Sequence, residues 1–293
     1  MFNVITILQR KSKKRNWLEV AFLFSTVSAL GIALFMLAML LITILQDGFL
    51  RLNWQFLTSF PSRNPEEAGI LSSLVGSFYL ITLTALIAVP LGIGAAIYFE
   101  KYAPKNWLNE IMEINIGTLA GIPSIIYGLL GLGLFVRLMA LDRSLIAGSL
   151  TLALLILPII VISAREAIRA IPSSIQEGAF ALGATRSQLI KTIILPLALP
   201  GIFTGVILAI SRAIGETAPL ITIGALTYIA FLPTSPMSYF TALPIQIFNW
   251  VSRPQEMFHI NAAAGIIVLV FITLLLNMLA IVLRNRFYKK SNS

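Results

Sequence analysis

Cysteine is absent from the 293-residue sequence, and histidine occurs once, at His259. Without cysteine the chain can form neither a disulfide nor a thiolate metal site, and it has no thiol nucleophile. A single histidine in a predicted external loop also leaves out the usual histidine-based metal and proton-transfer sites. Neither G-x-S-x-G nor H-E-x-x-H occurs. These absences argue against an enzyme, and we expect no metal and no cofactor on this chain.

Charged residues are scarce as well, at 11% of the chain, whereas 58% of the residues are hydrophobic and the mean hydropathy is +0.91. A soluble domain needs far more charge to cover its surface, so lipid must solvate much of this protein. The net charge of +9 would suit a nucleic acid, but lysine and arginine of membrane proteins gather on the cytoplasmic side. We therefore expect a multi-pass membrane protein with no nucleic-acid partner.

Long stretches without Asp, Glu, Lys or Arg mark the candidate membrane helices. They run over 20–46, 68–99, 114–136, 144–164, 192–211, 217–252 and 257–283. A spanning helix needs about 20 apolar residues, so the first four stretches and the last each predict one span. The fifth continues through the next few residues and predicts a helix over 197–222.

The stretch 217–252 contains Pro233, Pro236 and Pro244. Each proline removes a backbone donor, and unsatisfied backbone groups are costly in lipid. We therefore predict an external loop over 223–260, with a short helix near 241–251 lying at the membrane interface. The expected fold is all-α with six transmembrane helices.

The distribution of lysine and arginine predicts the orientation of these six spans. Fifteen of the 21 lie on one side, in the N-terminal segment, the loops after the second and fourth spans, and the C-terminus, whereas five lie on the other side. Cytoplasmic loops carry the excess of positive charge, so both termini are expected in the cytoplasm. The predicted divisions are a cytoplasmic segment 1–19, a first helix with an external loop 20–67, a transmembrane domain 68–285 with a charged loop 165–196, and a tail 286–293.

The charged cytoplasmic loop contains two helix-start patterns. Ser174 with Glu177 fits S-x-x-E, and Thr185 with Gln188 fits T-x-x-Q. In such a capping box the two side chains satisfy amides that have no partner in the first helical turn. Each pattern therefore predicts the start of a short helix.

Two further residues of this loop indicate where the chain changes direction. Gly183 can take the left-handed conformation that ends a helix, and Pro196 marks the predicted return of the chain into the membrane. The order is thus helix, glycine turn, helix. Short isolated helices are marginal in water, so a pair of them at the membrane surface suggests docking to a partner.

The same loop resembles the coupling loop of ABC importer permeases, E-A-A-x3-G-x9-I-x-L-P. The matching positions are Glu177, Ala179, Gly183 with its neighbour Ala184, Ile193, Leu195 and Pro196, and Gly178 replaces the first alanine. The resemblance implies that the loop inserts into a groove of a separate ATPase subunit, which would bind ATP and magnesium. Closure of the ATPase dimer would then rock the permease between inward and outward states. The chain contains no Walker motif, as expected if the ATPase is another chain.

The predicted fifth helix contains two ionisable residues, Arg212 and Glu216, four residues apart on one helix face. Ionisable residues inside a membrane are costly and indicate a functional site by default. One interpretation is that the two neutralise each other and help to pack the bundle. The other is that Arg212 faces the translocation path, where its planar fork of donors suits an oxyanion. Glu216 would then prevent a multiply charged anion from being trapped.

The motif GIPSIIYG lies in the predicted third helix. Gly121 and Pro123 should break or kink this helix and expose backbone polar groups where an anion could pass. Ser124 and Tyr127 add hydroxyl groups. A structural kink filled by neighbouring helices remains the alternative for each residue taken singly.

RAIGETAPL, in the fifth helix, resembles the signature of phosphate importer permeases of the PstA type. Segments 86–104, 121–132 and 242–254 resemble the same family, and the resemblance covers most of the chain after about residue 70. It implies a bacterial inner-membrane complex with a homologous PstC-type permease, two PstB-type ATPase subunits and a periplasmic PstS-type phosphate-binding protein. The pathway would lie between the two permeases, and its candidate residues here are Ser211, Arg212, Glu216, Thr217, Ser124 and Tyr127.

Two alternatives stay open. An importer of another oxyanion, such as phosphonate or sulfate, would use Arg212 in the same way. A channel or secondary transporter would need no coupling loop and is often built from inverted repeats, which the sequence does not show.

Overall fold

The computed structural model describes residues 2–104, 106–225 and 228–291, with side chains from residue 17 to 282 inside these ranges and at 284 and 285. The basic residues predicted at both ends, in 10–15 and 286–290, fall outside the described side chains. Five described helices are long and apolar enough to cross a membrane, or six if one bent pair counts as a single span. The predicted all-α membrane fold is confirmed.

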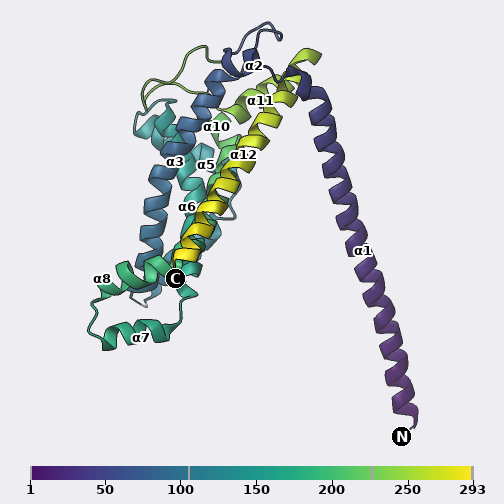
Figure 1. The fold of residues 1–293 in the computed structure, drawn as a ribbon, viewed down its shortest axis with the longest axis vertical. Coiled ribbons are helices and arrows are strands. Elements are labelled where there is room, and N and C mark those ends of the chain that lie inside the picture. The colour runs from purple at the N-terminus through teal and green to yellow at the C-terminus, as the bar shows by residue number, and fades with distance from the viewer. Residues whose placement is uncertain (1, 105, 226–227, 292–293) are drawn as a thin grey trace.

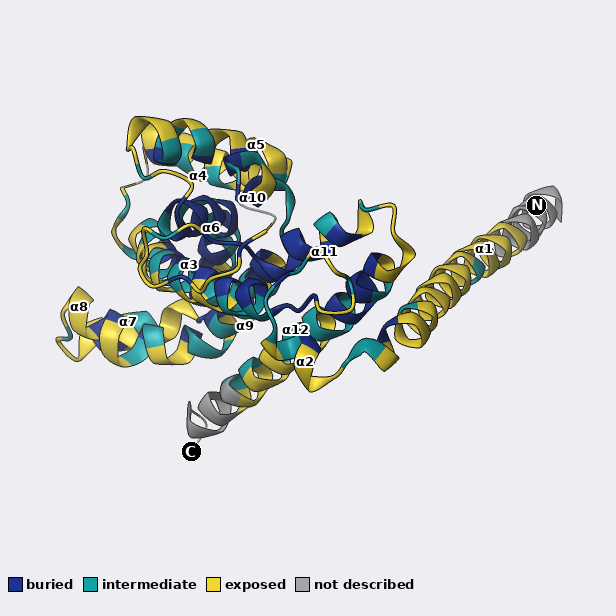
Figure 2. Cartoon of the chain, turned by 90° about the horizontal axis from the view of Figure 1, so that it is seen from above, coloured by how far each residue is buried: buried dark blue, intermediate teal, exposed yellow. Residues whose placement is uncertain are grey.

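The first helix stands apart from the other helices. It is α1 (Phe2–Gly48), and it meets the bundle only near its end, where it approaches the last helix, α12 (Glu256–Ser291). A Cβ atom added to Gly48 would lie 2.6 Å from the Ala263 carbonyl carbon, so the two backbones touch there. The rest of α1 diverges from the bundle (Figure 1), and nearly all of its residues over 17–47 are exposed (Figure 2).

Short elements beside this contact form one end of the molecule. The 3-10 turn η1 (Phe49–Arg51) and α2 (Trp54–Thr58) lead into a loop that Arg51 organises. Its guanidinium donates from Nε to Asn261 Oδ1 at 2.8 Å and from Nη2 to the carbonyl oxygen of Glu66 at 2.6 Å. Arg51 thereby joins the α1–α3 connection to α12.

The bundle is built around α6 (Leu145–Arg169), and 67% of the residues in its most apolar 18-residue stretch are buried. Its neighbours are α3 (Leu71–Ile97), which ends in the π-helical turn η2 (Tyr98–Tyr102), and α9 (Leu195–Gly215). Figure 2 shows the buried residues concentrated on α6, α11 and part of α12. The short α11 (Leu243–Val251) confirms the helix predicted near 241–251, and six of its nine residues are buried against the protein. Its location at the membrane interface stays a prediction.

The third predicted span is broken. It consists of α4 (Trp107–Leu119) and α5 (Ser124–Gly131), continued by η3 (Leu132–Leu138), and the two halves are bent by 110°. The break covers residues 120–123, so the effect predicted for Gly121 and Pro123 is confirmed. Pro123 occupies the N-cap of α5, where it loses no intrahelical hydrogen bond.

The fifth predicted span differs from the expectation at both ends. The prediction of one helix over 197–222 is wrong, because α9 ends at Gly215 and a separate α10 (Ala218–Ile223) follows. Pro219 explains the break, because its ring would clash with the carbonyl group four residues earlier, at Gly215. At the other end the helix does not turn at Pro196: it runs without a break from Arg186 to Gly215, through α8 (Arg186–Gln188) and η4 (Leu189–Ile194).

We expect Gly128→Ala in α5 to lower the free energy of unfolding by about 1–3 kcal/mol through overpacking. A Cβ atom at this position would lie 2.6 Å from Pro219 Cα and 2.8 Å from its carbonyl oxygen. The matched control is Gly133→Ala in η3, because no heavy atom lies within 4 Å of the added carbon there. Thermal unfolding of the purified protein in detergent would measure both, and equal Tm values for the two variants would contradict the close packing of α5 on α10.

Candidate functional site

The two ionisable residues of the fifth span lie at the end of α9, Arg212 in its last turn and Glu216 in the break that follows. Arg212 Nε donates to Glu216 Oε1 at 3.1 Å. Glu216 lies just beyond the helix end, with φ −74° and ψ 122°, so its backbone is extended rather than helical. The side chain of Glu216 is 15% exposed and that of Arg212 is 40% exposed. The predicted contact is therefore formed, and the arginine is the more accessible partner.

The two broken spans pack against each other. Gly128 of α5 lies directly on Pro219 of α10, three residues after Glu216. Tyr127, one residue earlier, is buried and donates from its hydroxyl to the carbonyl oxygen of Leu119 at 2.8 Å. This hydrogen bond satisfies the last turn of α4 across the bend. The structure thus brings the GIPSIIYG and RAIGETAPL motifs together, and it gives Tyr127 a structural role at the bend.

The remaining pathway candidates differ in where they lie. Ser211 is half-buried and faces α12, where its hydroxyl hydrogen-bonds Asn277 Oδ1. Thr217, at the N-cap of α10, and Ser124, at the start of α5, are half-buried at the two breaks. Sequence reasoning missed Asn277, although an isolated asparagine in an apolar run is a signal for an interhelical hydrogen bond.

The charged loop projects beyond the bundle at the end of the molecule where α1 begins and α12 ends (Figure 1). It contains α7 (Ser173–Ala181) and α8, joined by Gly183 at φ +82°. The Thr185–Gln188 capping box is confirmed: Gln188 N–H donates to Thr185 Oγ1 at 3.3 Å, and Thr185 N–H donates to Gln188 Oε1 at 2.8 Å.

The Ser174–Glu177 capping box is wrong, because the N-cap of α7 lies two residues earlier than predicted. Pro172 is its N-cap, and no side chain caps the first turn. Proline has its φ angle fixed at a value suited to helix entry. With Pro172 in that place, Ser174 falls inside the helix, where it cannot act as the cap.

Exposure separates the loop residues into two sets. Ala179 is buried, and Ala184, Ile193 and Leu195 are partly buried, on the core side of the loop. Glu177, Gly178, Gly183 and Pro196 are exposed. No heavy atom lies within 4 Å of a Cβ atom added at Gly178, so glycine and alanine fit equally well there. Leu182 is 91% exposed, and Glu177 and Phe180 of the same segment are exposed as well. Exposed apolar residues rimmed by polar ones are typical of a protein-binding surface.

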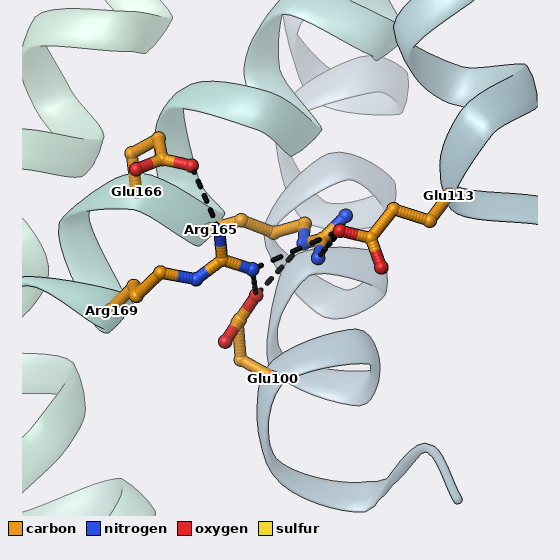
Figure 3. A network of polar contacts seen from close by, with 5 residues as sticks. All are labelled: Glu100, Glu113, Arg165, Glu166 and Arg169. Atoms are coloured by element: carbon orange, nitrogen blue, oxygen red, sulfur yellow. Dashed lines mark hydrogen bonds and ion pairs between the residues drawn. The ribbon is translucent and has the colours of Figure 1, made fainter. Parts of the chain in front are cut away.

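A cluster of charged residues lies where η2, α4 and α6 meet (Figure 3). Arg165 Nε donates to Glu100 Oε1 at 3.0 Å, and its Nη2 hydrogen-bonds Glu113 Oε1. Arg169 Nη2 donates to the same oxygen of Glu100 at 2.8 Å, and its Nη1 donates to Glu166 at 3.3 Å. We call these five residues the ion-pair cluster. Sequence reasoning missed it because the contacts from Arg165 and Arg169 to Glu100 and Glu113 join residues that are 52 to 69 positions apart in the chain.

Within the described part of the chain, no group of three or more His, Asp or Glu residues is placed to hold a metal ion. The polar chemistry available at the two helix breaks is a guanidinium, a carboxylate, hydroxyl groups and backbone groups freed by the breaks. This set can bind an anion and let it pass.

Comparison with known proteins gives a consistent result. Residues 88–292 match the family model of the binding-protein-dependent transport system inner membrane component. The chain is 35% identical to the probable ABC transporter permease protein YqgI of Bacillus subtilis, over 84% of this chain and 88% of that protein. It is 32% identical to the phosphate transport system permease protein PstA of Yersinia pestis, over 96% and 95% of the two chains.

A solved structure of a bacterial alginate ABC transporter, in complex with its periplasmic protein bound to an alginate pentasaccharide, contains a similar fold. The TM-score is 0.64 at 18% identity, with 92% of this chain and 94% of that chain covered. At this identity the likeness concerns the fold alone.

We expect Thr185→Ala to destabilise the start of α8 by about 1 kcal/mol, because it removes one half of the capping box. Thr192→Ala is the matched control, since Thr192 Oγ1 bonds the Gln188 carbonyl oxygen inside the continuous helix at 2.7 Å. Hydrogen exchange of the amides of 186–188 should be faster in the first variant and unchanged in the second. Equal protection in both would show that the box does not hold this turn.

Proposed function

The chain belongs to the family of binding-protein-dependent transport system inner membrane components, and we propose that it forms half of a pathway for inorganic phosphate. As a permease subunit it is multi-pass in the inner membrane, is not catalytic, and works with a separate ATPase and a substrate-binding protein. The proposed partners are a PstC-type second permease, two PstB-type ATPase subunits and a PstS-type binding protein. ATP and magnesium would be bound on the ATPase.

The observation that carries the proposal is the accessible guanidinium at a helix break within the membrane. Among the described residues, Glu216 contacts Arg212 through Nε, which leaves its fork of terminal amino groups available. A charged group in lipid is costly, so this side of α9 should face a water-filled path or a polar partner. Arginine remains charged and matches a phosphate oxygen pair bidentately.

The geometry also indicates how the anion would be released. Glu216 is close enough to hold Arg212 in one orientation when no anion is present. A phosphate on the terminal nitrogen atoms would meet the negative charge of Glu216 nearby, which limits its affinity. Conduction requires a site that is favourable enough to enter and weak enough to leave. A second permease would close the other side of the path.

The position of the charged loop supports the proposed orientation. The start of α1 and the end of α12 lie at the same end of the molecule as α7 and α8 (Figure 1). If α7 and α8 dock on a cytoplasmic ATPase, both termini are cytoplasmic, in agreement with the distribution of lysine and arginine. Docking would cover Glu177 together with the exposed side chains of Phe180 and Leu182.

We expect Arg212→Ala to reduce phosphate uptake at low external phosphate at least about tenfold, because one charge-assisted contact contributes roughly 1.5–3 kcal/mol. Uptake of labelled phosphate would be measured in cells that lack the native gene. Arg63→Ala, an equal loss of charge at an exposed site in the loop between α2 and α3, should retain uptake. Native uptake by a membrane-inserted Arg212→Ala variant would exclude the arginine from the path. If the native chain restores uptake of labelled sulfate or phosphonate and not of labelled phosphate, the cargo is another oxyanion.

Charge reversal in the loop tests coupling without touching the path. Glu177→Arg should abolish uptake because the reversed charge on α7 would disturb docking of this helix on the ATPase. Glu256→Arg, an exposed charge reversal at the start of α12, should retain uptake. Co-purification of the ATPase with each variant would locate the defect. If Glu177→Arg transports normally and retains the ATPase, the coupling role of α7 is wrong.

A further inference from the structure

The ion-pair cluster has a buried side and an exposed side. The Arg165 side chain is 9% exposed and that of Glu100 is 13% exposed, so this pair is nearly sealed from water. Glu113 contacts the same arginine, but its side chain is 48% exposed. Removing the partner of a buried charge is strongly destabilising, whereas an exposed ion pair contributes little. The Glu100 contact should therefore be permanent, and the Glu113 contact can open at small cost.

The buried side of the cluster is connected to the coupling loop. Glu100 belongs to η2, the turn at the end of α3, and its neighbours contact both loop helices. Lys101 Nζ donates to Gln176 Oε1 of α7 at 2.9 Å. The guanidinium carbon of Arg186, in α8, lies 5.6 Å from the centre of the Tyr102 ring. These contacts form a route by which a displacement of α7 and α8 can reach η2, and through Glu100 reach Arg165.

The exposed side of the cluster is connected to the broken third span. Glu113 lies on α4, which leads through the 110° bend into α5. A polar cavity of about 550 Å³ is lined by residues of η2, α4 and α6, among them Glu110, Glu113, Arg165 and Arg169. This cavity leaves space beside α4 into which the helix can move. At the other end of the span, Gly128 holds α5 on α10 beside Glu216.

Coupling between distant sites requires an element with two positions, not merely a chain of contacts. We propose that α4 is this element and that Glu113 is its releasable contact. Arg165, held by Glu100, is the fixed partner to which Glu113 binds in one transport state and from which it separates in the other. Glu113 is thus a positioning residue, which sets the angle of the α4–α5 bend when the coupling loop moves. The inference rests on the proposed coupling to a separate ATPase.

The absence of cysteine from the chain permits a direct measurement of this motion. Spin labels at Asn115→Cys on α4 and Ala170→Cys just after α6 occupy exposed positions. The assembled complex, with cysteine-free partners, would be reconstituted in lipid, and the distance between the labels compared without nucleotide and with ATP plus vanadate. We expect a nucleotide-dependent change of distance in the otherwise native chain.

In the Glu113→Gln variant we expect this change to be lost and phosphate uptake to fall about tenfold, within the usual range of coupling free energies. Glu110→Gln is the matched control, because Glu110 is an exposed glutamate of the same helix and lines the same cavity. It should retain both the distance change and the uptake.

Two results would overturn the inference. One is a Glu113→Gln complex that keeps the nucleotide-dependent change, including the case where only its Tm is lowered, because Glu113 would then be merely structural. The other is a native chain whose label distance does not respond to nucleotide. Neither depends on the cargo: if the complex transports another anion, native phosphate uptake fails while the distance change persists.

Discussion

Close approach of helix backbones around α6 is the constraint on which the rest of the structure depends. Lipid offers little hydrophobic driving force between helices, so association relies on van der Waals packing between small residues and on interhelical hydrogen bonds. Gly92 of α3 lies against Ile160, Gly131 of α5 against Thr151, and Gly205 of α9 against Ser163. In each case an added Cβ atom would lie within 2.6 Å of a side chain of α6. Three helices are thereby held at fixed rotations about one buried axis.

Fixed rotation matters because the polar residues of the spans are few. Once α9 is docked on α6, Ser211 faces α12 and the next residue, Arg212, remains accessible on another side. The breaks after α4 and α9 then lie close enough for the short helices that follow them, α5 and α10, to pack on each other. The proposed path therefore depends on two interruptions in otherwise regular helices, whose freed backbone groups need a polar surrounding or a neighbouring side chain. At one of these interruptions the Tyr127 hydroxyl donates a hydrogen bond to the freed carbonyl oxygen of Leu119.

The charged groups of the molecule serve different ends according to their burial. Arg51 joins the α1–α3 connection to α12 at one end of the molecule, and Arg165 joins three helices at the other. Both are held by several acceptors, which a guanidinium can use at once. Arg212, by contrast, is held through one nitrogen and keeps donors for another ligand. The number of acceptors around each arginine thus separates structural positions from the proposed binding position.

The sequence by itself determined the membrane class, the approximate spans, the break at Gly121 and Pro123, the Thr185–Gln188 box and the contact of Arg212 with Glu216. Each of these depends on the overall composition or on interactions between residues only a few positions apart in the chain. The same local rules failed at Ser174, where Pro172 takes the N-cap, and at Pro196, where η4 and α9 continue through the proline. They also did not show that six of the nine residues of α11 are buried against the protein. Only the tertiary structure decided the partners of Arg165, the meeting of α5 with α10 and the turning of Ser211 toward Asn277, because these join residues far apart in the chain whose faces are set by how the helices pack.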